Sequence, residues 1–269
     1  MRFSIITHFE PIPTEANARL MRAGLLAQRL AARGHSVTWW TPNFDHYLKR
    51  KRTPGDAVID AGEGLEIRLL KSIGYKRHIG VRRLINNELL ARRWSKQVRS
   101  QPVPDLVLSG WPTPEFGSSA VRYCKEMNIP AVIDIRDLWP DLWLGVLPNG
   151  LQGIGKVALK RYYRMKQETM KGVSSIVGIT DDFVDWGVAS SRKSRTNLDR
   201  SFAFRFRPSD LTEENRANAL RLLEDHGYRP DDRIQCVFAG SFSRSFDLFS
   251  FDLITVLIKD KLILNLSPV

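Results

Sequence analysis

Short apolar runs alternate with helical patterns from residue 3 to residue 180, and this alternation constrains the fold more than any other feature. The run Ala131–Ile133 is apolar at consecutive positions, which is typical of a strand that helices cover on both faces. The sequence predicts six strands, at Phe3–Thr7, His35–Thr41, Leu65–Leu70, Asp105–Ser109, Ile129–Ile135 and Ser175–Thr180. Alternation of this kind favours an α/β fold with a doubly wound, parallel sheet.

Helical periodicity fills the segments between these strands. The first helix is predicted over residues 15–33, where apolar residues recur at helical spacing and Gly34 follows as a C-cap. Further helices are predicted at residues 79–99, 114–127 and 151–172. Strands and helices together occupy residues 1–205, which we predict to form the first domain.

The character of the chain changes after Asp199. A Pro-containing linker is followed by a predicted helix at Leu211–His226 and a buried strand at Gln235–Ala239. Residues 249–269 form an apolar, β-prone string without an amphipathic helix. A second α/β domain needs roughly 100 residues. We therefore expect residues 206–269 to hold only the start of an incomplete second domain.

Composition limits the class and the compartment of the protein. Apolar residues make up 43% and charged residues 26%, as in ordinary soluble domains. The two cysteines, Cys124 and Cys236, form neither a disulfide framework nor a zinc pattern. The N-terminus has no signal-peptide pattern, and the late apolar window at residues 253–266 contains three charged residues. We expect a cytoplasmic protein.

Ligands of open parallel sheets bind beyond the carboxyl ends of the strands, and the loops at these ends carry carboxylates and tryptophans. Carboxylates accept hydrogen bonds from sugar hydroxyls, and indole faces pack on sugar C–H groups. The sequence therefore predicts a sugar-binding cleft at this edge. Its candidate residues are His8, Glu10, Trp111, Arg136, Asp137 and Trp139.

The loop Asp134–Asp141 is the most informative of these segments. An Asp at the end of a buried strand can serve as a general base or can orient an acceptor hydroxyl. The alternative is structural: Arg136 and Asp137 form an ion pair that fixes the loop, and Asp134 caps the next turn. The residues alone leave both interpretations open.

Five segments in the same order resemble the retaining family 4 glycosyltransferases of bacterial surface-polysaccharide synthesis, in the branch similar to the fucosamine transferases of O-antigen (lipopolysaccharide) assembly. They are spread over residues 1–247. The segments are Asn17–Arg22, Arg33–Trp40, Phe44–His46, Asp134–Asp141 and Phe238–Phe242.

This resemblance implies a GT-B architecture, in which a Rossmann-like N-terminal domain holds the acceptor and a C-terminal domain holds a nucleotide-sugar. Asp137, with Arg136 beside it, would lie near the acceptor hydroxyl and the transferred sugar. His8, Glu10 and the loop at Asn17 would line the acceptor cleft. The remaining matches, Gly240 and Arg244, would contact the donor diphosphate.

The chain also departs from the family pattern. The family's donor domain carries two glutamates eight residues apart, and nothing after Leu248 corresponds to them. The resemblance implies transfer of a sugar from a nucleotide-sugar to a lipid-linked saccharide, without metal or other cofactor. A catalytically inactive, truncated remnant that keeps only acceptor or membrane binding is the alternative.

A formal net charge of +12 requires a separate explanation. Much of it lies on two predicted helices, at residues 79–99 and 151–172. One interpretation is a solvated basic face over an apolar stripe. The other is peripheral docking on the anionic inner face of the plasma membrane, which suits a lipid-linked acceptor. Nucleic acid is the weakest explanation, because the aromatic residues form no stacking platform.

Overall fold

The computed structural model describes residues 1–15, 18–62, 64–76, 80–145, 147–204, 212–225, 227, 234–240 and 262–268. The chain divides into two compact units, Met1–Phe206 and Arg207–Val269.

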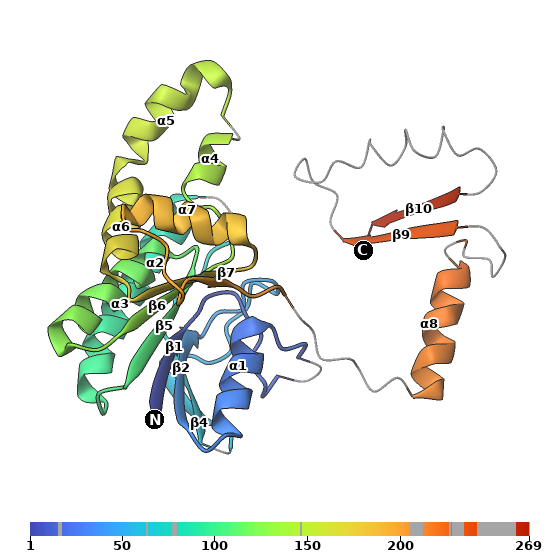
Figure 1. The fold of residues 1–269 in the computed structure, drawn as a ribbon. Helices are drawn as coiled ribbons and strands as arrows, with labels where there is room; N and C mark the ends of the chain where they lie inside the picture. The colour runs from blue at the N-terminus through green and yellow to red at the C-terminus, as the bar shows by residue number, and fades with distance from the viewer. Residues whose placement is uncertain are drawn as a thin grey trace. The chain divides into compact units, whose positions relative to one another are not determined.

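The first unit is built on an eight-stranded sheet with the order β3-β4-β2-β1-β5-β6-β7-β8 (Figure 1). Only β3 runs antiparallel to its neighbour, so the predicted α/β fold with a mainly parallel, doubly wound sheet is confirmed. The strands are β1 (Arg2–Ile6), β2 (Ser36–Pro42), β3 (Ala57–Asp60), β4 (Leu65–Leu70), β5 (Leu106–Trp111), β6 (Ala131–Ile135), β7 (Ser175–Gly178) and β8 (Arg200–Ser201).

Strand β1 lies at the centre of the sheet. The chain adds β2, β4 and β3 on one side of β1 and then β5 to β8 on the other side. Phe3 is paired with Val37 of β2 on one side and with Leu106 of β5 on the other. Such a switch point opens a crevice at the carboxyl ends of the strands, because the flanking loops leave in opposite directions. The loops after β1 and β5 therefore frame the place where a ligand is expected.

Helices cover both faces of the sheet. Trp39 and Trp40 are neighbours on β2, so their side chains point to opposite faces, yet both are fully buried. Trp39 packs in a cluster with α1, whereas Trp40 packs in a cluster with α2, α3, α6 and α7. The helices are α1 (Arg22–Ala31), α2 (Val81–Gln97), α3 (Pro114–Met127), α4 (Asp141–Gly145), α5 (Gln152–Ala158), α6 (Lys160–Gly172) and α7 (Asp181–Ser191), with 3-10 turns at Val98–Ser100 and Asn149–Leu151.

The first helix begins later than predicted, at Arg22 instead of residue 15. The Glu15 carboxylate accepts a hydrogen bond from the Ile12 N–H at 3.0 Å and pairs with Arg52 at 2.8 Å. These contacts fix Ile12–Glu15 as a turn, which helical periodicity could not reveal.

The predicted helix at 151–172 is two helices, because Leu159 leaves the helical conformation with φ −91° and ψ 6°. Leu159 is buried in a small cluster with Trp139, Leu144 and Tyr162, and the break directs it there. In Figure 1, α4 and α5 extend away from the sheet. Four elements of the first unit, namely α4, α7 and the edge strands β3 and β8, were not predicted.

The second unit contains α8 (Glu213–Asp225), β9 (Ile234–Gly240) and β10 (Leu262–Pro268). The predicted helix at 211–226 and strand at 235–239 correspond to α8 and β9. In the apolar tail, β10 pairs in parallel with β9, with Leu262 opposite Ile234 and Pro268 opposite Gly240.

Candidate functional site

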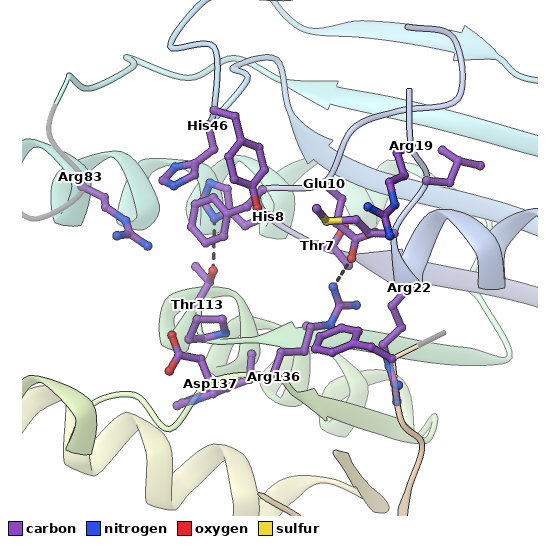
Figure 2. Close-up of a pocket in the computed structure, with 18 residues that line it drawn as sticks. Thr7, His8, Glu10, Arg19, Arg22, His46, Arg83, Thr113, Arg136 and Asp137 are labelled. Carbon is purple, nitrogen blue, oxygen red and sulfur yellow. Dashed lines mark hydrogen bonds and ion pairs between the residues drawn. The ribbon is translucent and has the colours of Figure 1, made fainter. Parts of the chain in front are cut away.

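A cavity of about 630 Å³ lies at the carboxyl ends of β1, β5 and β6 (Figure 2). Its walls come from segments that are far apart in the sequence. The lining residues are Thr7, His8, Phe9, Glu10, Arg19, Leu20, Met21, Arg22, His46, Tyr47, Arg83, Gly110, Trp111, Pro112, Thr113, Arg136, Asp137 and Phe204.

A buried network of charges forms one side of the cavity. Arg136 donates from Nε to Asp134 Oδ2 at 2.9 Å and forms an ion pair with Glu10. Arg22 donates from Nε to the same Asp134 oxygen at 2.9 Å. Burial lowers the pKa of the Arg136 guanidinium, but Glu10 and Asp134 more than offset this and raise it. The network connects the loop after β1, the start of α1 and the carboxyl end of β6 along one wall of the cavity.

Glu10 also holds the start of α1. Its Oε2 accepts the backbone N–H groups of Ala23 at 3.0 Å and Gly24 at 3.3 Å. The first N–H groups of a helix lack intrahelical partners, so a carboxylate there is stabilising. Glu10 was predicted to contact an acceptor. Its side chain is only 2% exposed, and it positions the helix and Arg136. Glu10 also lines the cavity, and its contact with an acceptor stays a prediction.

The structural alternative for the Asp134 loop was an ion pair between Arg136 and Asp137 together with a turn capped by Asp134. The structure shows neither contact among the described residues. Arg136 pairs with Asp134 and Glu10 among the described residues, not with Asp137. Asp134 is 2% exposed and pairs with Arg22 and Arg136 instead of capping a turn. Asp137 is thereby left at the cavity wall, outside the network.

Asp137 is a half-buried carboxylate. Burial raises its pKa, whereas the Leu138 backbone N–H and the positive charge of Arg83 partly oppose the rise. A carboxylate with incomplete solvation and a raised pKa is a better proton acceptor than one in water. The arrangement suits a group that orients or deprotonates a hydroxyl.

His8 lies across the cavity from the buried network. Its Nδ1 is 3.2 Å from Thr113 Oγ1, and its ring stacks on Phe9 at 4.3 Å between centroids. Burial lowers the pKa of His8 well below its usual value, and the charges of Arg83 and His46 lower it further. The ring is therefore neutral near pH 7, with one donor and one acceptor nitrogen.

Phe9 joins His8 to Glu10 in an uncommon backbone conformation. Its φ of 72° lies in the left-handed region that bulky residues rarely adopt. Such conformations cluster at functional sites, where surrounding contacts hold them in place.

The two predicted tryptophans have packing roles. Trp111 is fully buried, and its indole N–H donates to the Trp139 carbonyl at 3.0 Å. Trp139 packs edge-on against Trp143 and Tyr162, at 4.4 and 4.9 Å between centroids. Trp139 is 7% exposed and does not line the cavity, whereas Trp111 does line it. Contact of either ring with a sugar stays a prediction. Sequence alone does not distinguish a buried tryptophan from an exposed one.

Three further predicted residues are not among the described residues of the first unit. Asn17 and Arg244 fall outside the described residues. Gly240 ends β9 in the second unit, where its backbone pairs with β10. Its predicted contact with a donor diphosphate stays a prediction.

Sequence reasoning missed four basic residues of the cavity. These are Arg19, Arg22, His46 and Arg83. Arg19, Arg22 and His46 were within segments of the family resemblance, which was the available signal. Arg83 was counted among the basic face of a helix, and only the tertiary structure brings it to the cavity.

The first unit is an α/β, Rossmann-like domain with a mainly parallel sheet. No family model matches the sequence, and comparison with curated proteins gives no significant match. Solved structures do match, and they show the fold: α/β, Rossmann-like and of the GT-B glycosyltransferase type.

Three solved structures illustrate the likeness, and each of them matches 98% of this chain. The α,α-trehalose 6-phosphate synthase of Burkholderia multivorans has a TM-score of 0.57 at 10% identity. HepE of Anabaena, in complex with UDP-glucose, has 0.51 at 10%, and an Arabidopsis thaliana UGT, in complex with UDP-L-rhamnose, has 0.50 at 14%. The chain spans 62%, 59% and 63% of their respective lengths.

Proposed function

We propose that this chain is the acceptor-side part of a retaining glycosyltransferase. It would transfer a sugar from a nucleotide-sugar to a lipid-linked saccharide in the synthesis of a bacterial surface polysaccharide. The observation that carries the proposal is the cavity at the switch point of a GT-B-type sheet, where Asp137 is the carboxylate outside the buried network.

The cavity has the chemical groups that an acceptor sugar needs. Asp137 accepts a hydrogen bond from an acceptor hydroxyl and lowers the cost of its deprotonation. The neutral His8 ring and the Thr113 hydroxyl offer both donors and acceptors. Arg136 is held by Glu10 and Asp134, so its charge stays fixed beside Asp137.

The donor assignment rests on the solved structures. HepE and the Arabidopsis UGT were each solved with a UDP-sugar, which supports a nucleotide-sugar as donor here. By the family resemblance, the second unit would contact the donor diphosphate through Gly240 and Arg244. No other cofactor enters the proposal.

Membrane docking is the second part of the proposal. No helix in the described part of the chain is long and apolar enough to cross a bilayer. Helix α5 nevertheless exposes Ile154 and Val157, at 69% and 73%, and carries Lys156 between them. An apolar tip flanked by lysine fits an anionic lipid surface, where each basic residue contributes about 1 kcal/mol.

The test is transfer of radiolabelled sugar from a nucleotide-sugar to membrane lipid by the full chain. We expect Asp137→Asn to lower the rate by about 100-fold or more, as for loss of a general base. Asp182→Asn is the matched control, because Asp182 is an exposed Asp on α7. Equal rates for Asp137→Asn and wild type would refute the role of Asp137. No transfer by the wild-type chain with acceptor binding intact would favour the inactive remnant.

A further inference from the structure

Asp141 is the first residue of α4 and lies at the end of the loop that carries Asp137. Its carboxylate accepts hydrogen bonds from side chains of two other helices. Oδ1 accepts the Tyr163 hydroxyl at 2.5 Å, and Oδ2 accepts Lys166 Nζ at 3.0 Å. Oδ2 also accepts the indole N–H of Trp186 at 2.6 Å. One carboxylate therefore connects the loop after β6 with α6 and α7.

Lys166 is an uncommon partner, because lysine side chains are seldom buried. The residue is 9% exposed, and its Nζ lies 4.4 Å from the Trp186 ring centroid and 5.0 Å from that of Tyr163. A buried charge is costly unless it is paired. Asp141 is the carboxylate that pairs with Lys166, and the two aromatic faces complete its surroundings. The arrangement of these α6 and α7 side chains therefore depends on Asp141.

The two carboxylates of the loop differ in their surroundings. Burial by itself raises the pKa of Asp141, but the hydrogen bonds from Tyr163, Lys166 and Trp186 offset this and lower it below its usual value. Asp137 shows the reverse, since burial raises its pKa and its side chain lies at the cavity (Figure 2). Asp141 is thus engaged by the protein, whereas Asp137 is available to a ligand.

The connection between the two carboxylates is short. Residues 138–140 separate Asp137 from Asp141. Within this segment the Trp139 carbonyl accepts the indole N–H of Trp111 at 3.0 Å. So short a segment, anchored in its middle, cannot absorb a shift of α4, because three residues span at most about 10 Å. A displacement of Asp141 would therefore also displace Asp137.

We propose that Asp141 is a positioning residue, which holds the Asp137 carboxylate at the cavity by fixing the loop between them to α6 and α7. Its effect on transfer rests on the function proposed above; the fixing of the loop does not. Asp141 is not among the residues that line the cavity, so it acts through Asp137. Catalysis is sensitive to such positioning, because a misplacement of about 1 Å can lower a rate by about 100-fold.

The first test is the steady-state rate of sugar transfer from a radiolabelled nucleotide-sugar by Asp141→Asn. We expect kcat to fall by about tenfold or more, with the KM for the nucleotide-sugar unchanged, because the loop carries Asp137 and not the proposed donor contacts. Asp185→Asn is the matched control on α7. Its pair with Arg195 is exposed, so its kcat should stay within about twofold of wild type. Equal falls in kcat would overturn the proposal.

A double variant separates positioning from a general loss of stability. Added to Asp137→Asn, the change Asp141→Asn should lower kcat by less than about twofold, because no carboxylate remains to be positioned. A merely structural role would lower kcat by the same factor in both backgrounds, and that result would contradict the proposal. Trp186→Phe removes one donor and keeps an aromatic ring, so it should show a smaller fall of the same kind even if Asp141→Asn does not fold.

Hydrogen exchange tests the loop without any activity. The backbone amides of Leu142 and Trp143 donate to the carbonyls of Leu138 and Pro140. In Asp141→Asn their exchange should be faster by about tenfold or more, while the amides of β6 keep their rates. Faster exchange confined to this segment in a chain that transfers no sugar would keep the fixing of the loop and remove the proposed function. Unchanged exchange in a chain that does transfer sugar would do the reverse.

Discussion

Arg136 and Glu10 form a buried ion pair that connects the carboxyl end of β6 with the loop after β1. Glu10 in turn accepts the first N–H groups of α1, so one carboxylate fixes a helix and an arginine together. The wall beside Asp137 is therefore set by a pair whose two members are 126 residues apart in the sequence. Five predictions follow from the arrangement of this unit.

Glu10→Gln should destabilise the first unit by roughly 3 kcal/mol, because it leaves Arg136 without one of its buried partners. Asp134 remains, but it is shared with Arg22. The measurement is urea unfolding followed by tryptophan fluorescence. The control is Glu66→Gln, whose partly exposed pair with Arg68 should contribute under about 1 kcal/mol. Similar losses in the two variants would contradict this account.

Glu115 should make the stability depend on pH. Burial raises the pKa of this carboxyl from 4.5 to about 7. Between pH 4.5 and about 7 the native protein therefore keeps a proton that the unfolded chain releases. The stability contribution of Glu115 is fully present below pH 4.5 and is lost as the pH rises to about 7.

Replacing Glu115 by Gln should remove this dependence. We expect Glu115→Gln to gain stability relative to wild type between pH 4.5 and pH 7, by up to about 3 kcal/mol, and to gain no more above pH 7. Unfolding of both proteins across this range measures the difference. A difference that stays constant with pH would refute the prediction.

Asp137→Asn should stabilise the protein slightly while it removes transfer. Burial raises the pKa of Asp137, so its ionised form costs free energy in the native state above that pKa. The gain should be under about 1 kcal/mol, because the half-buried side chain is partly solvated. Thermal unfolding at pH 7 and at pH 4 tests this, since the gain should shrink at the lower pH. Destabilisation at pH 7 would show that the carboxylate supports the fold instead.

Gly187→Ala and Gly153→Ala should have opposite effects, although both glycines lie in helices. A Cβ at Gly187 would come within 2.6 Å of Ile135 Cδ1 and 2.9 Å of Ile176 Cγ2, between α7 and the sheet. Overpacking there should cost about 1–3 kcal/mol. At Gly153 no atom lies within 4 Å, so alanine should stabilise α5 by up to about 1 kcal/mol. Equal shifts in melting temperature would contradict the packing of α7.

Liposome sedimentation tests the docking of α5. The double variant Ile154→Glu, Val157→Glu should bind anionic vesicles at least about tenfold more weakly at low salt, because it removes apolar area and adds repulsion. Val58→Glu is the control, since Val58 is also exposed, at 57%, on the edge strand β3. Undiminished binding of the double variant would exclude α5 as the docking element.

The sequence predicted the parallel sheet well, because buried parallel strands have long apolar runs. Leu65–Leu70 and Pro114–Met127 were predicted with the bounds that the structure shows. Strand β3 was missed because it is a short edge strand with alternating exposure. The start of α1 was misplaced because Glu15 makes side-chain contacts that bend the chain, and no periodicity records such contacts.

For the site, the rule that ligands bind at carboxyl ends of strands placed His8, Arg136 and Asp137 on one cavity, as the structure has them. This rule predicts which loops meet at the cavity, but it does not predict which residues of these loops pair with one another. Glu10 and Trp111 also line this cavity. The rule did not predict that Glu10 accepts the first N–H groups of α1 or that the Trp111 indole donates to the Trp139 carbonyl.

The amino-acid sequence by itself determined the order of strands and helices, the parallel sheet and the loops that meet at its edge. These follow from local periodicity, which depends on near neighbours. The tertiary structure alone decided that Glu10 pairs with Arg136, that Trp111 is buried, and that Arg83 reaches the cavity with His46. Such pairings depend on the packing of distant segments, because burial and charge act through space and not along the chain.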